Sequence, residues 1–384
     1  MTTTEPAAPA RSFLAAEKEV LLAFFVSRML VWVLAWLAFR WIVHGTAFPV
    51  ASETEMWNLL FRWDSNWYGR IAQLGYEFFP DKPSSAAFFP LYPLCVRLVL
   101  VISGAQVSLA GFLVSNTALL GAVVLLRRLV ALDFPAPSRV PERTVWLFLL
   151  CPVTFFYSST YTESLFVLLS VAALLAARHR RWALAGLAGA LLTATRANGL
   201  IILVPLLWEA FAESRRRPDS EIAGRGILRS RWWLMLVPLG FVTFATYLYF
   251  RFGDALAFAH AQATWLRSFG PPWRALWNTW QGHPPGYGAW FVGAAAAAVI
   301  LFFVAWRVRL RKSYLLYAGV MLLILLSETI LESLPRYLSV LFPLHIGLAA
   351  ATARSEGLYL AALVTSTGLM AVCLVLFACG YWMT

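Results

Sequence analysis

The chain has 384 residues, of which 60% are hydrophobic, 15% aromatic and only 13% charged. Soluble domains are usually about 45–50% apolar and about 25% charged, so this composition excludes an ordinary soluble protein, a disordered chain and a disulfide-rich secreted module. With 18 Trp and 28 Phe and a mean hydropathy of +0.70, too little polar surface remains to cover the apolar side chains in water. The sequence therefore predicts an integral membrane protein in contact with membrane lipids.

The net charge of +12 comes from 31 Lys and Arg against 19 Asp and Glu. In a membrane protein such an excess is typical of basic cytoplasmic loops that fix the topology, with some basic residues left for an anionic lipid. We therefore expect no nucleic-acid partner. The four cysteines show no CxxC spacing, which indicates neither a zinc site nor a redox pair.

Eleven apolar runs approach the length of about 20 residues that a membrane-spanning helix needs. They are 20–43, 107–129, 143–159, 161–178, 182–196, 198–212, 232–252, 287–306, 313–331, 337–351 and 357–380. The first run follows a polar tail (1–19) and has no small-residue cleavage site after it, so we expect an uncleaved first helix. The predicted fold is one all-α polytopic bundle over residues 1–384.

The run 86–103 is ambiguous, because it begins with two prolines and carries Arg97 in its middle. If it stays on the outer surface as a juxtamembrane helix, most basic residues fall on the cytoplasmic side. These are Arg11, Lys18 and Arg354, together with the clusters at 127–143, 178–181, 215–231 and 307–312. The positive-inside rule favours that arrangement. We predict about 11 spans, a cytoplasmic N-terminus and an outer C-terminus.

This topology places two long loops on the outer side, 44–106 and 253–286. The first contains amphipathic segments and charged residues, and the second is rich in Trp, His, Gly and Pro. Such loops on a helical bundle predict a site that faces away from the cytosol. We detect no internal sequence repeat, which disfavours a secondary transporter.

The segment FRWDSNWYGRIAQLGYEFFP (61–80) holds the first candidate. Helical spacing places on one face Asp64, Trp67, Tyr68 and Ile71. Trp63, Trp67 and Tyr68 would hold this helix at the headgroup level, with Asp64 directed toward the bundle. Asp64 then either caps or solvates an interfacial helix, or acts as a general base for a hydroxyl acceptor.

The segments FFPLYPL (88–94) and FFYSSTYTESLF (155–166) follow. In the first, Tyr92 and the phenylalanines form an apolar groove floor, and a packing role is favoured. In the second, Glu163 stands at the outer start of an otherwise uncharged span, where an ionisable residue is a functional hypothesis. The alternative is a helix N-terminus capped by Thr160 or Thr162, with Glu163 in its first turn.

Two lone cations lie at outer ends of spans, Arg196 in TATRANGL (193–200) and Arg336 in SLPRYLSVLFPL (333–344). Each either snorkels to the headgroups or forms a bidentate fork for a phosphate. Asn198 follows Arg196 and is a candidate for contact with substrate. Walker, GxGxxG, HExxH and GxSxG motifs are absent from the sequence, so soluble nucleotide chemistry has no support.

Five segments, in this order, resemble the PIG-V family, the second mannosyltransferase of GPI-anchor assembly with its prokaryotic relatives. They are WDSNWYGRIAQLGY (63–76), FFPLYP (88–93), FFYSSTYTESLF (155–166), WALAGLAGALLTATRANGL (182–200) and LPRYL (334–338). The resemblance is most specific over residues 60–200. It fades through 210–330, where only the hydropathy matches.

The resemblance implies a GT-C-type membrane glycosyltransferase with its site on the non-cytoplasmic face, here expected in a prokaryotic plasma membrane. Such enzymes take a sugar, usually mannose, from a polyprenyl-phosphate carrier and invert the anomeric centre. An acidic residue of the first outer loop is the catalytic candidate in this superfamily, and Asp64 matches that position. The GPI-anchor acceptor does not carry over, so the expected acceptor is a glycolipid or another hydroxyl compound.

The expected mechanism uses Asp64 as the general base, with Arg196 and Arg336 on the donor phosphate. Glu163 orients the acceptor or supports an arginine. The substrate-binding residues would be Trp63, Trp67, Tyr68, Tyr92, Glu163 and Asn198. A cation or a divalent metal ion would offset the charge that grows on the phosphate. No regularly spaced metal-ligand set is present in the sequence, and His260 and His283 are interpreted as polar loop residues.

Two alternatives stay open. A transporter that flips a lipid-linked sugar would need ionisable residues near mid-span, and the segment 107–194 has almost none beyond the ends of its spans. A GT-C enzyme that uses another polyprenyl-phosphate sugar would look the same, because no residue separates mannose from other sugars.

Overall fold

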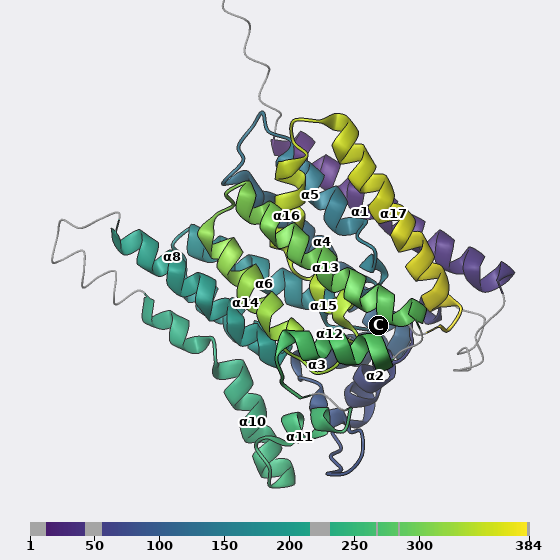
Figure 1. The fold of residues 1–384 in the computed structure, drawn as a ribbon. Helices are drawn as coiled ribbons and strands as arrows, with labels where there is room; N and C mark the ends of the chain where they lie inside the picture. Colours follow the sequence, from purple (N-terminus) through teal and green to yellow (C-terminus); the bar gives the residue numbers. More distant parts are fainter. Residues whose placement is uncertain (1–12, 43–55, 216–230, 266–267, 283–284, 382–384) are drawn as a thin grey trace, which may run out of the picture.

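The computed structural model describes residues 13–42, 56–215, 231–265, 268–282 and 285–381. Within these ranges the chain is a bundle of helices (Figure 1), and the only strand-like pairing is a single bridge between Phe269 and Glu328. The predicted all-α membrane bundle is confirmed.

Six helical segments of the described chain are long and apolar enough to cross a membrane: Glu17–Trp41, Val107–Ala131, Ala197–Arg215, Trp232–Phe252, Gly286–Arg307 and Glu356–Ala378. They correspond to α1 (Phe13–Trp41), α4 (Val107–Ala131), η4 (Ala197–Ile202) with α8 (Leu203–Arg215), η5 (Trp232–Leu236) with α10 (Leu239–Phe252), α13 (Pro285–Arg307) and α17 (Glu356–Ala378). These spans coincide with six of the eleven predicted runs.

Shorter helices fill the other predicted runs. They are α5 (Val140–Leu149), α6 (Glu163–Arg178), α7 (Trp182–Thr193), α14 (Lys312–Leu326), α15 (Leu334–Ser339) and α16 (Phe342–Ala351). The count of eleven spans is therefore not confirmed. Hydropathy over a window cannot register helix breaks, and two breaks are visible at prolines: α5 ends shortly before Pro152, and α16 begins anew at Phe342–Pro343.

The remaining described elements are short. They are η1 (Met56–Asn58), α2 (Asp64–Leu74), η2 (Ser85–Ala87), α3 (Leu91–Ser103), η3 (Thr154–Tyr157), α11 (Ala257–Ala263) and α12 (Pro272–Gly282). The ambiguous run 86–103 thus forms η2 and α3. At 13 residues, α3 is about 20 Å long, which is shorter than the roughly 30 Å of a hydrocarbon core.

A buried arginine explains how the break after α5 is tolerated. Arg28 of α1 is only 5% exposed, and its guanidinium donates to the carbonyl oxygens of Leu149 (2.8 Å) and Thr154 (3.2 Å) and to the hydroxyls of Thr154 (2.9 Å) and Ser158 (3.2 Å). Backbone that leaves helical geometry at membrane depth needs such partners, because water is not available there. Arg28 was not among the candidate residues predicted from the sequence.

Ion pairs hold the basic segments together at one end of the bundle. We call this end the basic end. The pairs are Arg128–Glu17, Arg139–Glu19, Arg143–Glu356, Arg178–Asp133, Arg180–Glu213, Arg231–Glu213 and Arg311–Glu209. Arg11 and most of the cluster at 215–231 lie outside the described residues. The described basic clusters therefore lie together, as the predicted cytoplasmic loops require.

The other end of the bundle carries α2. Arg62 lies just before α2 and donates to the carbonyl oxygen of Ala378 (2.6 Å), at the far end of α17 from Glu356. Since α17 has 23 residues, about 35 Å separates its two ends. Figure 1 shows α1 and α17 side by side along this length, and α2, α3, α11 and α12 together near one end. We call this the site end.

Candidate active site

The helix α2 places the first candidate residue. Asp64 is the first residue of α2, after Trp63, whose φ is 47°, and the helix stops at Leu74 before Gly75, whose positive φ of 87° suits glycine. Tyr68 and Ile71 are buried, as the predicted face requires, whereas the exposed fraction of the Asp64 side chain is 27%. The start of α2 thus directs Asp64 toward the bundle, where it pairs with Arg336 and stays partly exposed to solvent.

Four charged residues from separate elements meet beside α2. Arg336 of α15 donates from Nη1 to Asp64 Oδ2 (2.7 Å), and its Nε lies 3.5 Å from Glu163 Oε1 of α6. Arg196, which precedes η4, donates from Nη2 to the same Glu163 oxygen and from Nε to Thr162 Oγ1 (2.6 Å). We call Asp64, Glu163, Arg196 and Arg336 the charged network; its formal charge is zero.

The charged network is buried. The exposed fraction is 0% for the Glu163 side chain, 4% for Arg336 and 12% for Arg196. Buried charges cost several kcal/mol each unless they are paired, and here each cation faces a carboxylate. This burial disfavours the snorkelling interpretation of Arg196 and Arg336. It leaves Asp64 as the most accessible charged group of the network.

Aromatic rings surround the two guanidinium groups. The Arg336 guanidinium lies 4.9 Å from the ring centres of both Tyr161 and Tyr337, and that of Arg196 lies 5.1 Å from Tyr337. Ring faces attract cations. Burial alone would lower the pKa of Arg336, but the neighbouring Tyr337, Asp64 and Glu163 together raise it well above its usual value. Both the rings and the carboxylates therefore keep this guanidinium charged.

Polar atoms of the network are left over. Among the described residues, the buried atoms Glu163 Oε2, Arg196 Nη1 and Asn198 Oδ1 have no hydrogen-bond partner. Native proteins rarely leave buried polar atoms unsatisfied, because each costs about 1–3 kcal/mol. Glu163 and Arg196 therefore keep hydrogen-bonding capacity that a bound polar group could fill. Asn198 lies in η4, two residues after Arg196, and is half-buried.

The aromatic candidates divide into two groups. Trp67 stacks on Phe88 at 5.8 Å and meets Trp265 edge-on at 5.9 Å, which forms an aromatic wall beside α2. Trp63 instead packs on Phe377 of α17 at 4.7 Å. Trp265 belongs to the second predicted outer loop but was not singled out, and only the aromatic richness of that loop could have indicated it.

Tyr68 and Tyr92 pack edge-on at 5.2 Å. Tyr92 is fully buried, and its hydroxyl lies 2.8 Å from Ser115 Oγ, so the packing role fits Tyr92 better than contact with substrate. Burial raises the pKa of Tyr68 above its usual value, with a smaller contribution from Glu163 and Asp64. The phenol of Tyr68 therefore stays neutral at physiological pH.

Three residues that contact Arg196 or Arg336 were not predicted as site residues. Tyr161, Thr162 and Tyr337 were visible only as neighbours of Glu163 and Arg336 in the quoted motifs. Thr162 occupies the N-cap position of α6, but its side chain makes no capping bond and instead accepts from Arg196. The capping alternative for this motif is therefore not the arrangement observed.

The site offers no good fit to a divalent cation. Across the described residues, no group of three or more His, Cys, Asp or Glu side chains could hold a metal ion, and the carboxylates of Asp64 and Glu163 already face guanidinium groups. His260 pairs with Asp254 (2.6 Å) on the surface, and His283 lies outside the described residues. We therefore route no step through a metal ion.

An apolar groove borders the site. It has a volume of about 330 Å³ and runs beside α15, the helix that carries Arg336. Small residues of α13 line one wall: Ala289, Gly293, Ala294, Ala297 and Ala298. Pro335, Leu338 and Ser339 of α15 also line the groove, as do the larger Trp290 and Leu301 of α13. No residue of the charged network lines the groove; its link to the network is Pro335, which directly precedes Arg336 in α15.

Comparison with known proteins agrees with the motif resemblance. A family model described as Mannosyltransferase (PIG-V) matches residues 18–268, about two thirds of the chain, so the match extends beyond the segment 60–200 on both sides. The motif LPRYL with Arg336 lies outside the matched residues. No curated protein matches the chain.

Among solved structures, the crystal structure of the Archaeoglobus fulgidus oligosaccharyltransferase complex with Zn and sulfate is similar. The TM-score is 0.46 and the sequence identity 15%, over 92% of this chain and 53% of that one. The chain thus spans about half the length of that relative.

Proposed function

Because this chain belongs to the mannosyltransferase (PIG-V) family, a family of membrane glycosyltransferases, we propose that it transfers mannose from a polyprenyl-phosphate carrier to a hydroxyl-bearing acceptor. The observation that carries the proposal is the charged network, in which two guanidinium groups and two carboxylates from four elements meet with unfilled bonding capacity. The acceptor is a glycolipid or another hydroxyl compound at the membrane surface.

The proposed reaction is a single displacement at the anomeric carbon. The acceptor oxygen attacks this carbon while its proton passes to a carboxylate oxygen of Asp64. The bond between the anomeric carbon and the phosphate oxygen breaks, and polyprenyl phosphate leaves with the electron pair. Attack from the opposite side inverts the anomeric centre. Asp64 suits the role of base because it is the most accessible carboxylate of the network.

The two arginines would hold the phosphate. Guanidinium binds phosphate through paired N–H groups, and Arg196 Nη1 is a buried donor that finds no partner among the described residues. Glu163 holds both arginines, through Oε1. Its role is therefore to support the arginines, which was one of the two roles expected from the sequence.

The ion pair between Asp64 and Arg336 predicts the order in which donor and acceptor bind. In the structure, Arg336 Nη1 donates to Asp64 Oδ2 at 2.7 Å, so this oxygen already has a donor and is not free for the acceptor hydroxyl. A phosphate that binds Arg336 competes with Asp64 for that donor. Donor binding would therefore release Asp64 to accept the acceptor proton, and the acceptor would react only after the donor is in place.

The apolar groove supports a lipid-linked donor rather than a nucleotide sugar. It borders α15 next to Arg336 and is walled by small residues of α13, so a prenyl chain could lie there while its phosphate reaches the network. The aromatic wall of Trp67 and Trp265 offers faces on which a sugar ring could stack. Trp63, Tyr68 and Asn198 complete the proposed surroundings of the substrates.

The proposed site faces the outside of the cell membrane. The support is the separation of the basic end from the site end along α1 and α17, because basic segments favour the cytoplasmic side. Two variants test this orientation, each with one cysteine in place of an exposed residue, Asn66 or Ala353, and with the four native cysteines removed. Both variants are labelled in intact cells. An impermeant reagent should modify the cysteine at 66 but not the one at 353; the opposite pattern would overturn the orientation.

Transfer itself is tested with purified protein in lipid vesicles. We expect transfer of mannose from polyprenyl-phosphate-mannose and none from GDP-mannose. Polyprenyl-phosphate-glucose, tested in parallel, shows whether the enzyme distinguishes the two sugars. Transport of the donor across the vesicle membrane without transfer would instead support a flippase. Mass spectrometry of glycolipids and glycoproteins from cells with and without the gene then identifies the sugar and the acceptor together.

A further inference from the structure

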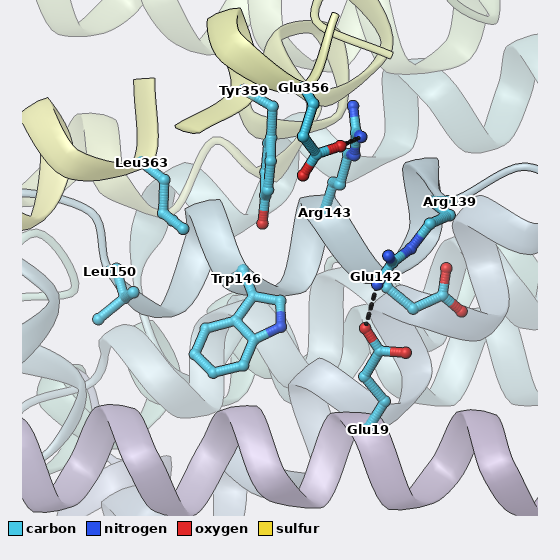
Figure 2. Close-up of a pocket in the computed structure, with 9 residues that line it drawn as sticks. All are labelled: Glu19, Arg139, Glu142, Arg143, Trp146, Leu150, Glu356, Tyr359 and Leu363. Atoms are coloured by element: carbon cyan, nitrogen blue, oxygen red, sulfur yellow. Dashed lines mark hydrogen bonds and ion pairs between the residues drawn. The ribbon is translucent and has the colours of Figure 1, made fainter. Parts of the chain in front are cut away.

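A second cavity lies at the basic end, on the opposite side of the bundle from the charged network. It has a volume of about 270 Å³ and is bounded by α1, α5 and α17 (Figure 2). Its charged lining residues are Glu19, Arg139, Glu142, Arg143 and Glu356. Nothing in the proposed transfer reaction uses this cavity, so it needs an explanation of its own.

The mouth of the cavity presents charges of both signs. Arg139 pairs with Glu19 at 3.0 Å, and Arg143 pairs with Glu356. The side chains of Arg139 and Glu356 remain 53% and 62% exposed, so both can engage a further group. Arg143 is fixed more firmly, since it also donates to the carbonyl oxygen of Thr352 at 2.9 Å.

The other end of the cavity is apolar. Figure 2 shows Trp146, Leu150 and Leu363 on the side away from the arginines. From Arg139 to Leu150 the chain follows α5, which corresponds to a rise of about 16 Å. The cavity therefore runs from a charged mouth at the end of the bundle toward the membrane interior, as a lipid does.

We propose that this cavity binds a phospholipid with a primary ammonium headgroup, of the phosphatidylethanolamine type. Its phosphate accepts hydrogen bonds from Arg139, and its ammonium donates to Glu356 and Glu19. One acyl chain lies over Trp146 and Leu363. The lipid thereby joins α1, α5 and α17 at the end where the three helices are held by ion pairs.

The balance of charges selects this headgroup. Three carboxylates and two guanidinium groups line the cavity, and the third carboxylate, that of Glu142, is paired with Arg127 at 3.2 Å. The charges are therefore balanced, and a headgroup with only negative charge gains no net attraction. A choline headgroup keeps the phosphate but has no N–H donor for the carboxylates. A headgroup with one phosphate and one ammonium complements both signs.

The test uses the purified, delipidated full chain and lipids with matched acyl chains. Thermal unfolding and native mass spectrometry are recorded with phosphatidylethanolamine, phosphatidylcholine and phosphatidylglycerol. We expect phosphatidylethanolamine to raise the unfolding midpoint most and to be retained about tenfold more than either other lipid, because it alone forms both sets of charge-assisted hydrogen bonds.

Arg139→Gln is the informative variant, and Arg128→Gln is its matched control. Arg128 lies at the same end, pairs with Glu17 of α1 at 2.9 Å and is 43% exposed, but it does not line the cavity. Arg139→Gln should lose most of the lipid-induced shift, and Arg128→Gln should keep it. Glu356→Gln should remove the preference over phosphatidylcholine while lipid binding persists.

Three results would overturn the proposal. Equal shifts from all three lipids would indicate an unselective lipid belt. A larger shift from phosphatidylglycerol would indicate a site for anionic lipid. An equal loss in Arg139→Gln and Arg128→Gln would show that the effect does not depend on this cavity.

Discussion

The two ends of the bundle each hold a network of buried or half-buried charges, and the networks differ in how completely their hydrogen bonds are satisfied. At the basic end, Arg178 donates hydrogen bonds to both carboxylate oxygens of Asp133, at 2.7 and 2.9 Å. The Tyr314 hydroxyl donates to one of these oxygens at 2.8 Å. Arg311 donates hydrogen bonds to both carboxylate oxygens of Glu209 at 2.6 Å. This network ties α4, α6, α8 and α14 together.

At the site end, the charged network of Asp64, Glu163, Arg196 and Arg336 makes single contacts instead of bidentate ones. In the described part of the chain, one oxygen of Glu163 and one terminal nitrogen of Arg196 find no hydrogen-bond partner. A saturated network gains stability from its geometry, whereas an unsaturated one costs stability unless a ligand completes it. The contrast supports our proposal that substrate binds at the charged network, whereas the network of Asp133, Arg178, Glu209 and Arg311 stabilises the fold.

The largest expected effect is on catalysis at Asp64. Asp64→Asn keeps the size and much of the hydrogen bonding but cannot accept a proton at neutral pH. Transfer normalised to folded protein should fall by at least about 10²-fold, as general-base contributions are typically 10²–10⁴-fold.

Glu77→Gln is the matched control for Asp64→Asn. Glu77 lies in the same predicted outer loop but makes an exposed pair with Arg70; Glu53 and Glu55, in the same loop, lie outside the described residues. Glu77→Gln should be nearly silent. Near-normal turnover by Asp64→Asn would remove Asp64 from the mechanism and leave Glu163 as the remaining carboxylate.

The second expected effect is on donor binding. Arg196→Lys and Arg336→Lys keep the positive charge but lose the planar fork, so each should raise the KM for polyprenyl-phosphate-mannose about tenfold. The folded amount, measured by size-exclusion in detergent, should change little.

Arg311→Lys is the comparison variant at the basic end. It loses an equivalent fork to Glu209 and should lower the unfolding midpoint while the KM for the donor stays the same. If Arg196→Lys and Arg336→Lys also lose only stability, the two networks do not differ in function.

The third expected effect is on stability alone. Asp133→Asn removes the carboxylate that Arg178 and Tyr314 share and should cost about 1–3 kcal/mol of unfolding free energy. Turnover per folded molecule should be unchanged, as measured by the same transfer assay. A specific loss of turnover would show that the basic end communicates with the site.

The smallest expected effect comes from Tyr314→Phe. This change removes two hydrogen bonds, the one that the Tyr314 hydroxyl donates to Asp133 Oδ2 (2.8 Å) and the one that it accepts from Arg178 Nη1 (3.0 Å), while Arg178 still holds both carboxylate oxygens. We expect a loss of about 1 kcal/mol, seen as a small decrease in the unfolding midpoint. A loss as large as that of Asp133→Asn would mean that the hydroxyl, rather than the ion pair, holds this end together.

The sequence by itself determined the class of protein and the family. Composition demanded a membrane bundle, hydropathy located a helix within each predicted run, and the order of five motifs identified the PIG-V family. These properties are readable because the transfer of apolar side chains into lipid depends on local composition. The candidate residues Asp64, Glu163, Arg196 and Arg336 were also readable, since a charge at the edge of an apolar run stands out.

Only the tertiary structure decided what these charges do to one another. Asp64 and Arg336 are 272 residues apart in the chain, and nothing in either motif specifies that they pair. The helix breaks that reduce the long spans to six among the described residues likewise depend on distant partners, as Arg28 shows by satisfying the carbonyl oxygens of Leu149 and Thr154. In a bilayer, freed backbone groups and buried charges are stable only where other helices supply partners, so their places are set by packing and not by any local stretch of sequence.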